Sequence, residues 1–409
     1  MPSLAVSVGR VNATTLIREY LLLGLRFDRV EEGYVDAYTG DPQLRRIVAD
    51  EPPPQPADLA RQARRLLAEL PAVDLEPARA DFIGAHLRAL ECAARKFAGE
   101  QVGFVDEVEA YFDVRITKGD PERYRQAHAR LDEVLGGSGP LADRMQAYRA
   151  AEQVPPERLE ECIHAFSSAL RDRVREMYPL PETETITYEV VTDKPWSGFN
   201  YYLGDYRSRV AVNADLKQQM SNLPRLVAHE SYPGHHTEHC RKEAGLVRRA
   251  GQDEQTIFLV NTPQCLMAEG LADLGLYAAV GPDWGGWAAE IYADLGLAFD
   301  GERAQAVAEA TTALADVRQD AALMLHDEHR DVDEVVAYLK RWLLVDDDRA
   351  RQMLRFLASP LWRAYTSTYV EGYRLLRGWL DARPAEVSLA ERFGRLLDEP
   401  LIPSALRAA

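Results

Sequence analysis

Cysteine is scarce in this chain. Only four occur in 409 residues, and no two of them form a C-x-x-C pair; they are Cys92, Cys162, Cys240 and Cys265. Scattered cysteines are typical of reduced thiols in a cytosol, whereas small secreted folds use paired cysteines as a disulfide framework. The sequence therefore excludes a disulfide-stapled scaffold and predicts a cytoplasmic protein.

Long apolar runs are also missing. No stretch approaches the roughly 20 consecutive apolar residues that a membrane helix needs. Residues 1–10 contain no charged segment followed by a long apolar run, so we expect no signal peptide. We therefore expect no membrane partner.

Positive charge is in deficit, with 48 Lys and Arg against 65 Asp and Glu, which gives a formal net charge of -17. Nucleic acids and anionic membranes are bound by basic patches, so this balance argues against both. The nearest basic cluster is Arg241-Lys242 with Arg248-Arg249, and Glu243 interrupts it. We interpret it as a solvated helix face. The sequence does not indicate an oligomeric state.

The length and the 46% hydrophobic content allow a large core. We expect two subdomains around a cleft, a helical one at 1–180 and a metal-binding catalytic one at 181–409. Apolar residues at helical spacing predict a mainly α protein, with helices at 12–25, 57–70, 77–99, 121–135, 140–152, 157–178, 264–277, 284–296, 302–326, 332–343, 347–357 and 360–382. Alternating β-branched residues at 185–191 and 208–213 predict a small antiparallel sheet beside the metal-binding helix.

The segment 227–236 reads Val-Ala-His-Glu-Ser-Tyr-Pro-Gly-His-His, and Glu269 follows on another apolar segment. Two imidazoles and one carboxylate, with an open position for water, are the ligands of a catalytic zinc. His229 and Glu230 have the order of the His-Glu-x-x-His motif, in which the glutamate is the general base.

The second histidine is displaced from its usual place, because Pro233 occupies the position four residues after His229. In an unbroken helix His235 would point roughly 120° away from His229, and His236 would lie about 10 Å along the axis. Pro233 lacks an N–H, and Gly234 adopts backbone angles closed to other residues. We therefore expect a bulge that brings His235 to the metal, with His236 as the reserve ligand.

Two alternatives compete with this arrangement. His235 and His239 form an i, i+4 pair with Cys240 beside it, which would bind metal without a general base. The whole cluster could also be a histidine-rich helix end with no metal, since motif matches carry a false-positive risk.

Glu269 is the expected third ligand. Asp273 lies one turn further along the same predicted helix face. A carboxylate at that position accepts the outer N–H of a zinc-bound histidine and sets its tautomer.

The motif His-Glu-x-x-Pro-Gly-His-His, the Glu-Gly pair at 269–270 and the run Ser-Thr-Tyr-Val-Glu-Gly at 367–372 resemble the bacterial DUF885 family, which is similar to gluzincin-type zinc peptidases. The likeness extends to residues 25–29 and 33–40, so it covers nearly the whole chain. It implies a mainly helical, zincin-like fold.

The resemblance also implies roles for single residues. His229, His235 and Glu269 would hold Zn²⁺, Glu230 would take a proton from water, and Tyr369 would hydrogen-bond the developing oxyanion. Tyr373, one turn on, is the rival of Tyr369. The family often has an Asp-x-Gly-x-His run, of which this chain keeps His326 as a possible substrate contact.

The function expected from these residues is that of a zinc-dependent metallopeptidase acting on a peptide or a small amide. A carboxypeptidase would need a cation for the terminal carboxylate, and Arg374, Arg377, Arg207 or Arg209 could supply it. The alternatives are a zinc hydrolase of a non-peptide amide or ester and a metal-free helical protein with a structural or interaction role.

Overall fold

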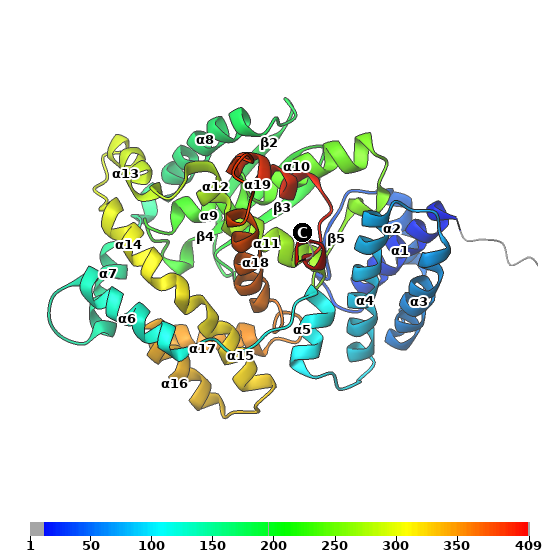
Figure 1. The fold of residues 1–409 in the computed structure, drawn as a ribbon, viewed down its shortest axis with the longest axis horizontal. Coiled ribbons are helices and arrows are strands. Elements are labelled where there is room, and N and C mark those ends of the chain that lie inside the picture. Colours follow the sequence, from blue (N-terminus) through cyan, green and yellow to red (C-terminus); the bar gives the residue numbers. More distant parts are fainter. Residues whose placement is uncertain (1–11, 195, 408–409) are drawn as a thin grey trace, which may run out of the picture.

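Residues 12–194 and 196–407 are described by a computed structural model, and most of them lie in helices (Figure 1). The predicted mainly α class is confirmed. Within these ranges, none of the helices combines the length and the apolar character that crossing a bilayer requires. The expectation about a signal peptide concerns residues 1–10, which lie outside the described residues.

The amino-terminal part of the chain is built from helices that begin at proline or at a polar cap. Pro42, Pro56, Pro77 and Pro121 each stand at the first helical position, where the missing N–H has no partner to lose. The elements are α1 (Ala13–Phe27), β1 (Val35–Tyr38), α2 (Pro42–Asp50), α3 (Pro56–Glu69), η1 (Leu70–Ala72), α4 (Pro77–Phe97), α5 (Phe104–Phe112), α6 (Pro121–Leu135), α7 (Leu141–Ala151), η2 (Pro156–Arg158) and α8 (Leu159–Met177).

The six helices predicted in this part are confirmed within two residues at each end. The sequence analysis missed α2 and α5. Each has only nine residues, too few for a repeated apolar spacing to stand out.

A three-stranded sheet precedes the histidine motif. It consists of β2 (Thr185–Val191), β3 (Gly198–Gly204) and β4 (Arg207–Asn213), in the order β2-β4-β3. A tight turn joins β3 to β4 antiparallel, with positive φ at Asp205 (52°) and Tyr206 (60°), as two-residue hairpins require. The hairpin leaves the other edge of β4 free, and β2 pairs with it in parallel. The prediction of an antiparallel sheet was therefore wrong: the sheet is mixed, and β3 was missed.

A second, two-stranded sheet joins the amino-terminal part of the chain to its middle. Strand β1 pairs antiparallel with β5 (Ile257–Leu259), and the register shifts between Val35 and Ala37. Asp36 therefore occupies a β-bulge, a feature that re-aims a side chain and occurs often beside active sites.

The remaining chain returns to helices. Two predicted helices are interrupted: 264–277 breaks after Asp273, and 302–326 breaks where Thr311 and Thr312 both donate hydroxyl hydrogen bonds to the carbonyl of Ala308. Such back-bonding bends helices. The elements are η3 (Ala214–Leu216), α9 (Leu223–Glu230), α10 (His235–Lys242), η4 (Glu243–Arg249), η5 (Asp253–Thr256), α11 (Pro263–Asp273), α12 (Gly275–Val280), α13 (Trp284–Asp294), α14 (Gly301–Thr311), η6 (Thr312–Ala315), α15 (Asp316–His326), α16 (Val332–Leu343), α17 (Asp347–Ala358), η7 (Thr368–Gly372), α18 (Tyr373–Asp381), α19 (Leu389–Asp398) and α20 (Pro403–Arg407).

The predicted helix 360–382 is also shorter than expected. Residues 360–365 form turns, and the helical part starts as the π-helical segment η7 before continuing as α18.

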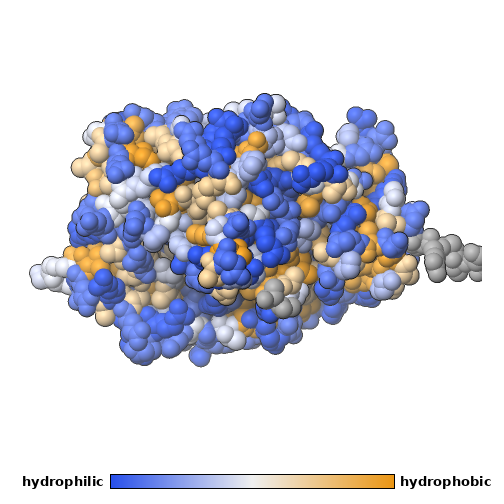
Figure 2. All heavy atoms as spheres, turned by 45° about the horizontal axis from the view of Figure 1, so that its top comes forward, coloured by the Kyte–Doolittle hydropathy of each residue, from blue (hydrophilic) through white to orange (hydrophobic). Residues whose placement is uncertain are grey.

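Buried apolar side chains from α1 through α20 belong to one cluster. In Figure 1, α1–α4 lie at one end of the molecule, α6, α7, α13 and α14 lie at the other, and α11 and α18 run near the middle. The face shown in Figure 2 is mostly hydrophilic, with apolar residues scattered across it. The division into subdomains at residue 180 stays a prediction.

Candidate metal centre

The histidine motif forms the end of one helix and the start of the next. Helix α9 ends at Glu230 and α10 begins at His235. The amide of Gly234 donates to the carbonyl of Ala228 (3.0 Å), and a Cβ placed on Gly234 would overlap the carbonyl oxygen of His229. Only glycine permits this close return of the chain. The expected bulge within one helix was therefore wrong: the Pro-Gly segment breaks the helix in two.

This break brings the two imidazoles face to edge. The Nε2 atoms of His229 and His235 lie 3.1 Å apart, and their ring planes meet at 89°. A continuous helix would have pointed these side chains in different directions.

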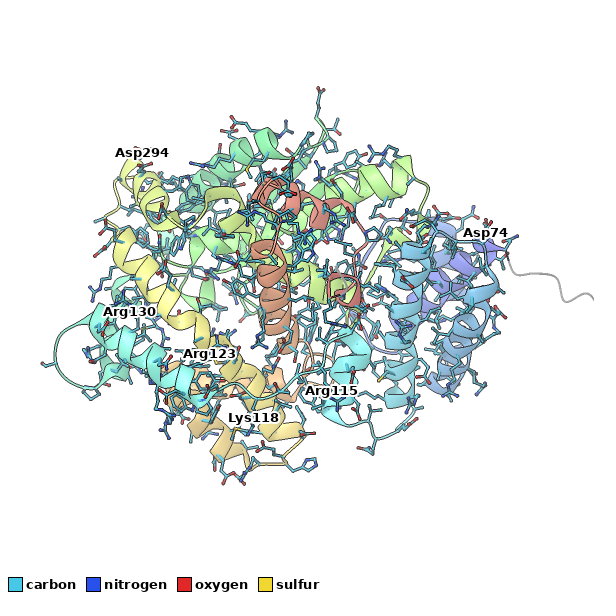
Figure 3. All side chains as sticks on the ribbon, viewed as in Figure 1. Asp74, Arg115, Lys118, Arg123, Arg130 and Asp294 are labelled. Atoms are coloured by element: carbon cyan, nitrogen blue, oxygen red, sulfur yellow. The ribbon has the colours of Figure 1, made fainter. Side chains whose placement is uncertain are left out.

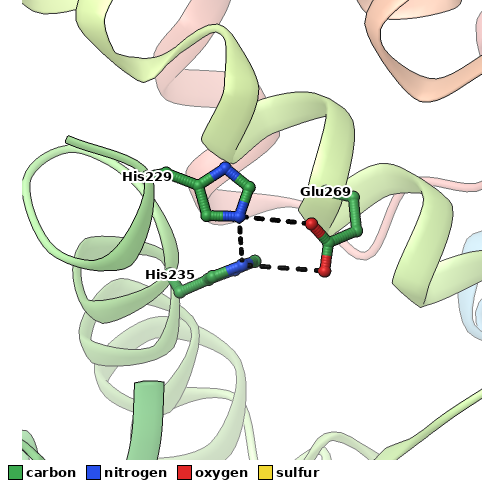
Figure 4. A group of neighbouring side chains, drawn as sticks. All are labelled: His229, His235 and Glu269. Carbon is green, nitrogen blue, oxygen red and sulfur yellow. Dashed lines mark hydrogen bonds and ion pairs between the residues drawn. The ribbon is translucent and has the colours of Figure 1, made fainter. Parts of the chain in front are cut away.

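Glu269 completes the group from α11, as Figure 4 shows. Its Oε2 lies 3.2 Å from Nε2 of His229, and its Oε1 lies 3.8 Å from Nε2 of His235. One ligand atom from each of the three residues fits within 4.8 Å of the other two. The structure thus brings together the three residues expected to hold the metal.

Asp273 lies behind His229. Its Oδ1 is 3.0 Å from Nδ1 of His229, so this ring nitrogen carries the proton and Nε2 is left to face Glu269. Burial works against a charge on His229, but the hydrogen bond with Asp273 and the nearby carboxylate of Glu269 outweigh it and raise the pKa of His229 well above its usual value. The same carboxylates that hold a proton here favour a metal cation.

The spacing of the donor atoms fits zinc. Tetrahedral ligands at the ~2.0–2.1 Å bond lengths of zinc stand roughly 3.4 Å apart. The separations of 3.1, 3.2 and 3.8 Å bracket that value. Glu269 is 6% exposed, and its Oε2 has no hydrogen bond among the described residues. A buried carboxylate oxygen without a partner is costly, and a cation would satisfy it.

Glu230 lies beside the three donors on the last turn of α9. It is 6% exposed, and its carboxylate makes no hydrogen bond within the described parts of the chain. Burial raises the pKa of Glu230 to about 7, against the opposing charge of His229. A carboxyl group with this pKa is suited to proton transfer near neutral pH.

Strand β3 fixes the position of Glu230. The side-chain amide of Asn200 donates to the carbonyl of Glu230 (2.6 Å). A Cβ on Gly198 would come within 3.0 Å of Oε1 of Glu230, so the glycine leaves room for the carboxylate next to the strand.

Two tyrosines from the segment around η7 approach the centre. The hydroxyl of Tyr365 donates to Oε1 of Glu269 (2.7 Å), a contact that the sequence analysis missed. Tyr369 packs edge-on against Tyr365, with ring centroids 5.8 Å apart, and is 36% exposed. Its hydroxyl has no hydrogen bond partner among the described residues. Tyr365 lies four residues before Tyr369, and this helical spacing was the only signal for it.

The reserve ligand His236 points into the core instead. It is fully buried, and its ring nitrogens contact Ser208 Oγ (2.8 Å) and Glu184 Oε2 (3.0 Å). Glu184 also accepts hydrogen bonds from three more side chains, those of Tyr232, Arg171 and Arg175.

The His235–His239 alternative is not assembled either. The ring of His239 stacks on Tyr202, with centroids 4.5 Å apart, and Cys240 is buried beside His236. Neither side chain joins the three metal donors.

The other candidate residues are engaged elsewhere. Nε2 of His326 contacts the carbonyl of Leu357 (2.7 Å), and Tyr373 is partly buried against the core. The four candidate arginines for a terminal carboxylate all have acidic partners: Arg374 with Glu371 and Asp316, Arg377 with Asp381, Arg207 with Asp205, and Arg209 with Glu189.

Asp36 is a further group that the sequence analysis did not select. Burial and the charge of Glu269 raise the pKa of Asp36 to about 7. The charge of Asp36 in turn contributes to the raised pKa of Glu230. The β-bulge that aims Asp36 toward these carboxylates depends on the pairing of β1 with β5, which local sequence does not reveal.

Comparison with known proteins shows likeness in fold and little in sequence. No family model and no curated protein matches the chain. Two solved structures are each described as a "putative lipoprotein". One is from Colwellia psychrerythraea (TM-score 0.53, 16% identity, 85% of this chain and 65% of that one), and the other, of unknown function, is from Shewanella oneidensis (TM-score 0.50, 12% identity, 89% of this chain and 75% of that one). This chain thus spans about 65% of the length of the Colwellia protein. A weaker likeness, with a TM-score of 0.40 and 13% identity over 96% of this chain and 93% of the other, is to an M32 carboxypeptidase from Deinococcus radiodurans R1.

Proposed function

We propose that this protein is a zinc-dependent metallopeptidase of the gluzincin type, with a zincin-like site of the kind implied by the DUF885 resemblance. The observation that carries the proposal is the convergence of His229, His235 and Glu269 on one point, with Glu230 beside them. Two histidines and one carboxylate that leave a fourth position open are the ligand set of a catalytic zinc.

Zinc bound at this point would polarise the scissile carbonyl and lower the pKa of water to the neutral range. Glu230 accepts the proton of the attacking water and delivers it to the leaving amine. Its raised pKa, about 7, suits both steps, because the group must be a base first and an acid afterwards.

Tyr369 would stabilise the oxyanion. Its hydroxyl has no other hydrogen bond among the described residues and is therefore free to donate, whereas the hydroxyl of Tyr365 already holds Glu269. The pKa of Tyr369 is raised well above its usual value by burial and by the nearby Glu269, so the phenol keeps its proton for this role.

An extended peptide suits this site better than a compact ester. Strand β3 is an edge strand of its sheet, and its first residue, Gly198, adjoins the carboxylate of Glu230. A peptide added to such an edge lies extended, with one carbonyl held beside the catalytic groups.

The test is metal analysis combined with a substrate screen. The purified protein is expected to contain about one zinc per chain and to cleave members of a mixed peptide library. A chelator should abolish cleavage, and added zinc should restore it. Cleavage of small amides or esters but of no peptide would move the function to a non-peptide hydrolase, and a chain that binds no zinc would overturn the proposal.

A further inference from the structure

Strand β3 has an inner and an outer face, because successive side chains of a strand point to opposite sides. The inner face includes Gly198 and Asn200 and packs on helix α9, so Asn200 is buried. The outer face carries Phe199, Tyr201 and Leu203. All three are at least partly exposed, and Leu203 is 54% exposed. A solvated sheet face is usually polar, and an apolar edge strand is a liability, so these apolar side chains need an explanation.

The rings on this face form a row that starts just before the strand. The ring centroids of Trp196 and Phe199 lie 5.6 Å apart, and those of Phe199 and Tyr201 lie 4.7 Å apart. On β4, Cζ of Arg209 lies 4.6 Å from the ring centroid of Tyr201, and its guanidinium is 3.5 Å from the carboxylate of Glu189. We call Trp196, Phe199 and Tyr201 the aromatic row. Contacts within the row and with Arg209 hold the rings while part of their surface stays open.

The neighbouring strands do not continue the aromatic row. Arg209 stands opposite Tyr201 on β4, and Thr187 stands opposite Arg209 on β2. Charged side chains also cover other exposed parts of the molecule. Two that Figure 3 labels, Arg115 and Lys118, are exposed and ion-paired. The apolar side chains of this sheet face thus gather on the strand at its edge.

The free edge of β3 leads to the metal centre. Strand β4 pairs with one edge of β3, and no strand in the described parts of the chain pairs with the other. Where β3 begins, this edge adjoins Glu230, since a Cβ on Gly198 would come within 3.0 Å of Oε1 of Glu230. Where β3 ends, Cγ2 of Thr39 would stand 3.2 Å from a Cβ on Gly204. The room for a peptide is therefore at the Gly198 end, beside Glu230.

We propose that the aromatic row binds a large apolar side chain of the substrate, next to the scissile bond. This inference rests on the proposed peptidase function and adds a substrate class to it. A peptide that pairs with the free edge of β3 has side chains that alternate between the same two faces. When one residue of the peptide faces the metal centre, its neighbours project onto the outer face, where side chains on adjacent strands lie about 5 Å apart. An aromatic side chain there would pack against Phe199 in the way that aromatic pairs favour.

The experiment moves a phenylalanine through a short soluble peptide of alanine and serine. Both termini are free, so that cleavage at either end or in the middle is registered by mass spectrometry. With the zinc-loaded wild type, phenylalanine at one position next to the cleaved bond is expected to raise kcat/KM roughly 10-fold over alanine at that position, the size of one buried aromatic contact.

Phe199→Ala should bring the ratio of kcat/KM for the phenylalanine and alanine peptides close to one. If that variant does not fold, Phe199→Leu replaces it, because leucine keeps most of the bulk without the ring. It should lower the preference for phenylalanine over leucine at the same position. Val190→Ala is the matched control, since Val190 is 44% exposed on β2, the opposite edge strand of the same sheet. This control should retain the wild-type preference.

A binding measurement separates this proposal from the peptidase function. Calorimetry on chelator-treated protein should show the phenylalanine peptide binding about 10-fold more tightly than the alanine peptide, and Phe199→Ala should abolish the difference. Equal cleavage and equal binding of the two peptides would overturn the aromatic subsite and leave the metallopeptidase intact. Loss of zinc or of all cleavage, with selective binding retained, would overturn the peptidase alone.

Sedimentation of the wild type and of Phe199→Ala covers the remaining occupant, a second copy of this chain. The wild type is expected to show no association that depends on the aromatic row. Concentration-dependent dimerisation that Phe199→Ala abolishes, without any preference among the peptides, would assign the row to a contact between copies and overturn the proposal.

Discussion

Gly270 and Gly372 lie backbone against backbone where α11 crosses η7. A Cβ on Gly270 would stand 2.5 Å from the carbonyl carbon of Gly372, and a Cβ on Gly372 would stand 2.5 Å from the carbonyl oxygen of Leu266. This close crossing brings the segment that carries Tyr365 against α11, where the hydroxyl of Tyr365 donates to Glu269.

Gly372→Ala is expected to push the two helices apart. Overpacking of this kind costs about 1–3 kcal/mol of unfolding free energy, and the displaced Tyr365 would leave Glu269 without its hydrogen bond. The melting temperature and the zinc content should both fall. Gly378→Ala on α18 is the control, since a Cβ there meets no atom within 4 Å. The Gly378→Ala variant should be as stable as the parent or more stable. Equal losses of melting temperature and zinc content in both variants would refute the packing argument.

Glu230→Gln tests the general base. The amide is isosteric but cannot accept the proton, so kcat should fall by about 10²–10⁴-fold while zinc stays bound. His229→Ala should lose both zinc and activity. Elemental analysis with peptide kinetics measures the pair, and a glutamine variant that cleaves at the parent rate would show that another group is the base.

Asp273→Asn should weaken the metal site without removing a ligand. The amide can still be accommodated next to Nδ1 of His229, but it no longer stabilises that N–H with a negative charge. Loss of such an outer partner typically lowers metal affinity or activity about 10–100-fold. Competition with a chromogenic chelator would report the change, and an unaltered affinity would contradict the role given to Asp273.

The two adjacent histidines should behave differently. His235→Ala is expected to lose zinc, whereas His236→Gln should keep it, because His236 bonds Ser208 and Glu184 in the core. The cost of His236→Gln should appear instead in stability, at about 1–3 kcal/mol for a disturbed buried polar group. Zinc retained by the first variant and lost by the second would reverse the ligand assignment.

Stability should fall on acidification through His86. This side chain is fully buried against Phe82, and desolvation lowers its pKa from 6.5 to about 4. Below pH 6.5 His86 is protonated in the unfolded chain but stays neutral in the folded chain. The free energy of unfolding therefore decreases as the pH falls toward 4, and it decreases no further through this group below that pH. At 1.36 kcal/mol per pKa unit the loss is on the order of 3 kcal/mol. Urea melts at pH 7 and pH 4.5 would measure it.

The matched variant for that prediction is His86→Gln, which cannot titrate. Its unfolding free energy should change less than that of the parent between the same two pH values. A parallel pH dependence in both proteins would assign the acid sensitivity to other groups.

Local sequence predicted what depends on neighbours along the chain. Helix ends followed from proline at the first turn and from polar caps, because these act within a few residues of where they stand. A distortion between His229 and His235 followed from Pro233 and Gly234, but its form did not. A bulge within one helix was predicted, whereas the contacts of Gly234 with the preceding turn separate two helices.

Patterns that depend on partners far away in the chain were missed or misread. The parallel pairing of β2 with β4 and the bulge at Asp36 are set by pairing across the fold. Side-chain alternation shows which face of a strand is buried but not which strand lies beside it, nor in which direction it runs.

The sequence by itself determined the residue types of the candidate metal centre: two histidines and a carboxylate, the glutamate beside them and the glycines that allow close crossings. Only the tertiary structure decided that His235 and not His236 faces His229 and that Tyr365 donates a hydrogen bond to Glu269. The physical reason is range. Backbone preferences act over one helical turn. The direction of a side chain and its hydrogen-bond partners depend instead on residues that are tens to hundreds of positions away in the sequence and become neighbours only on folding.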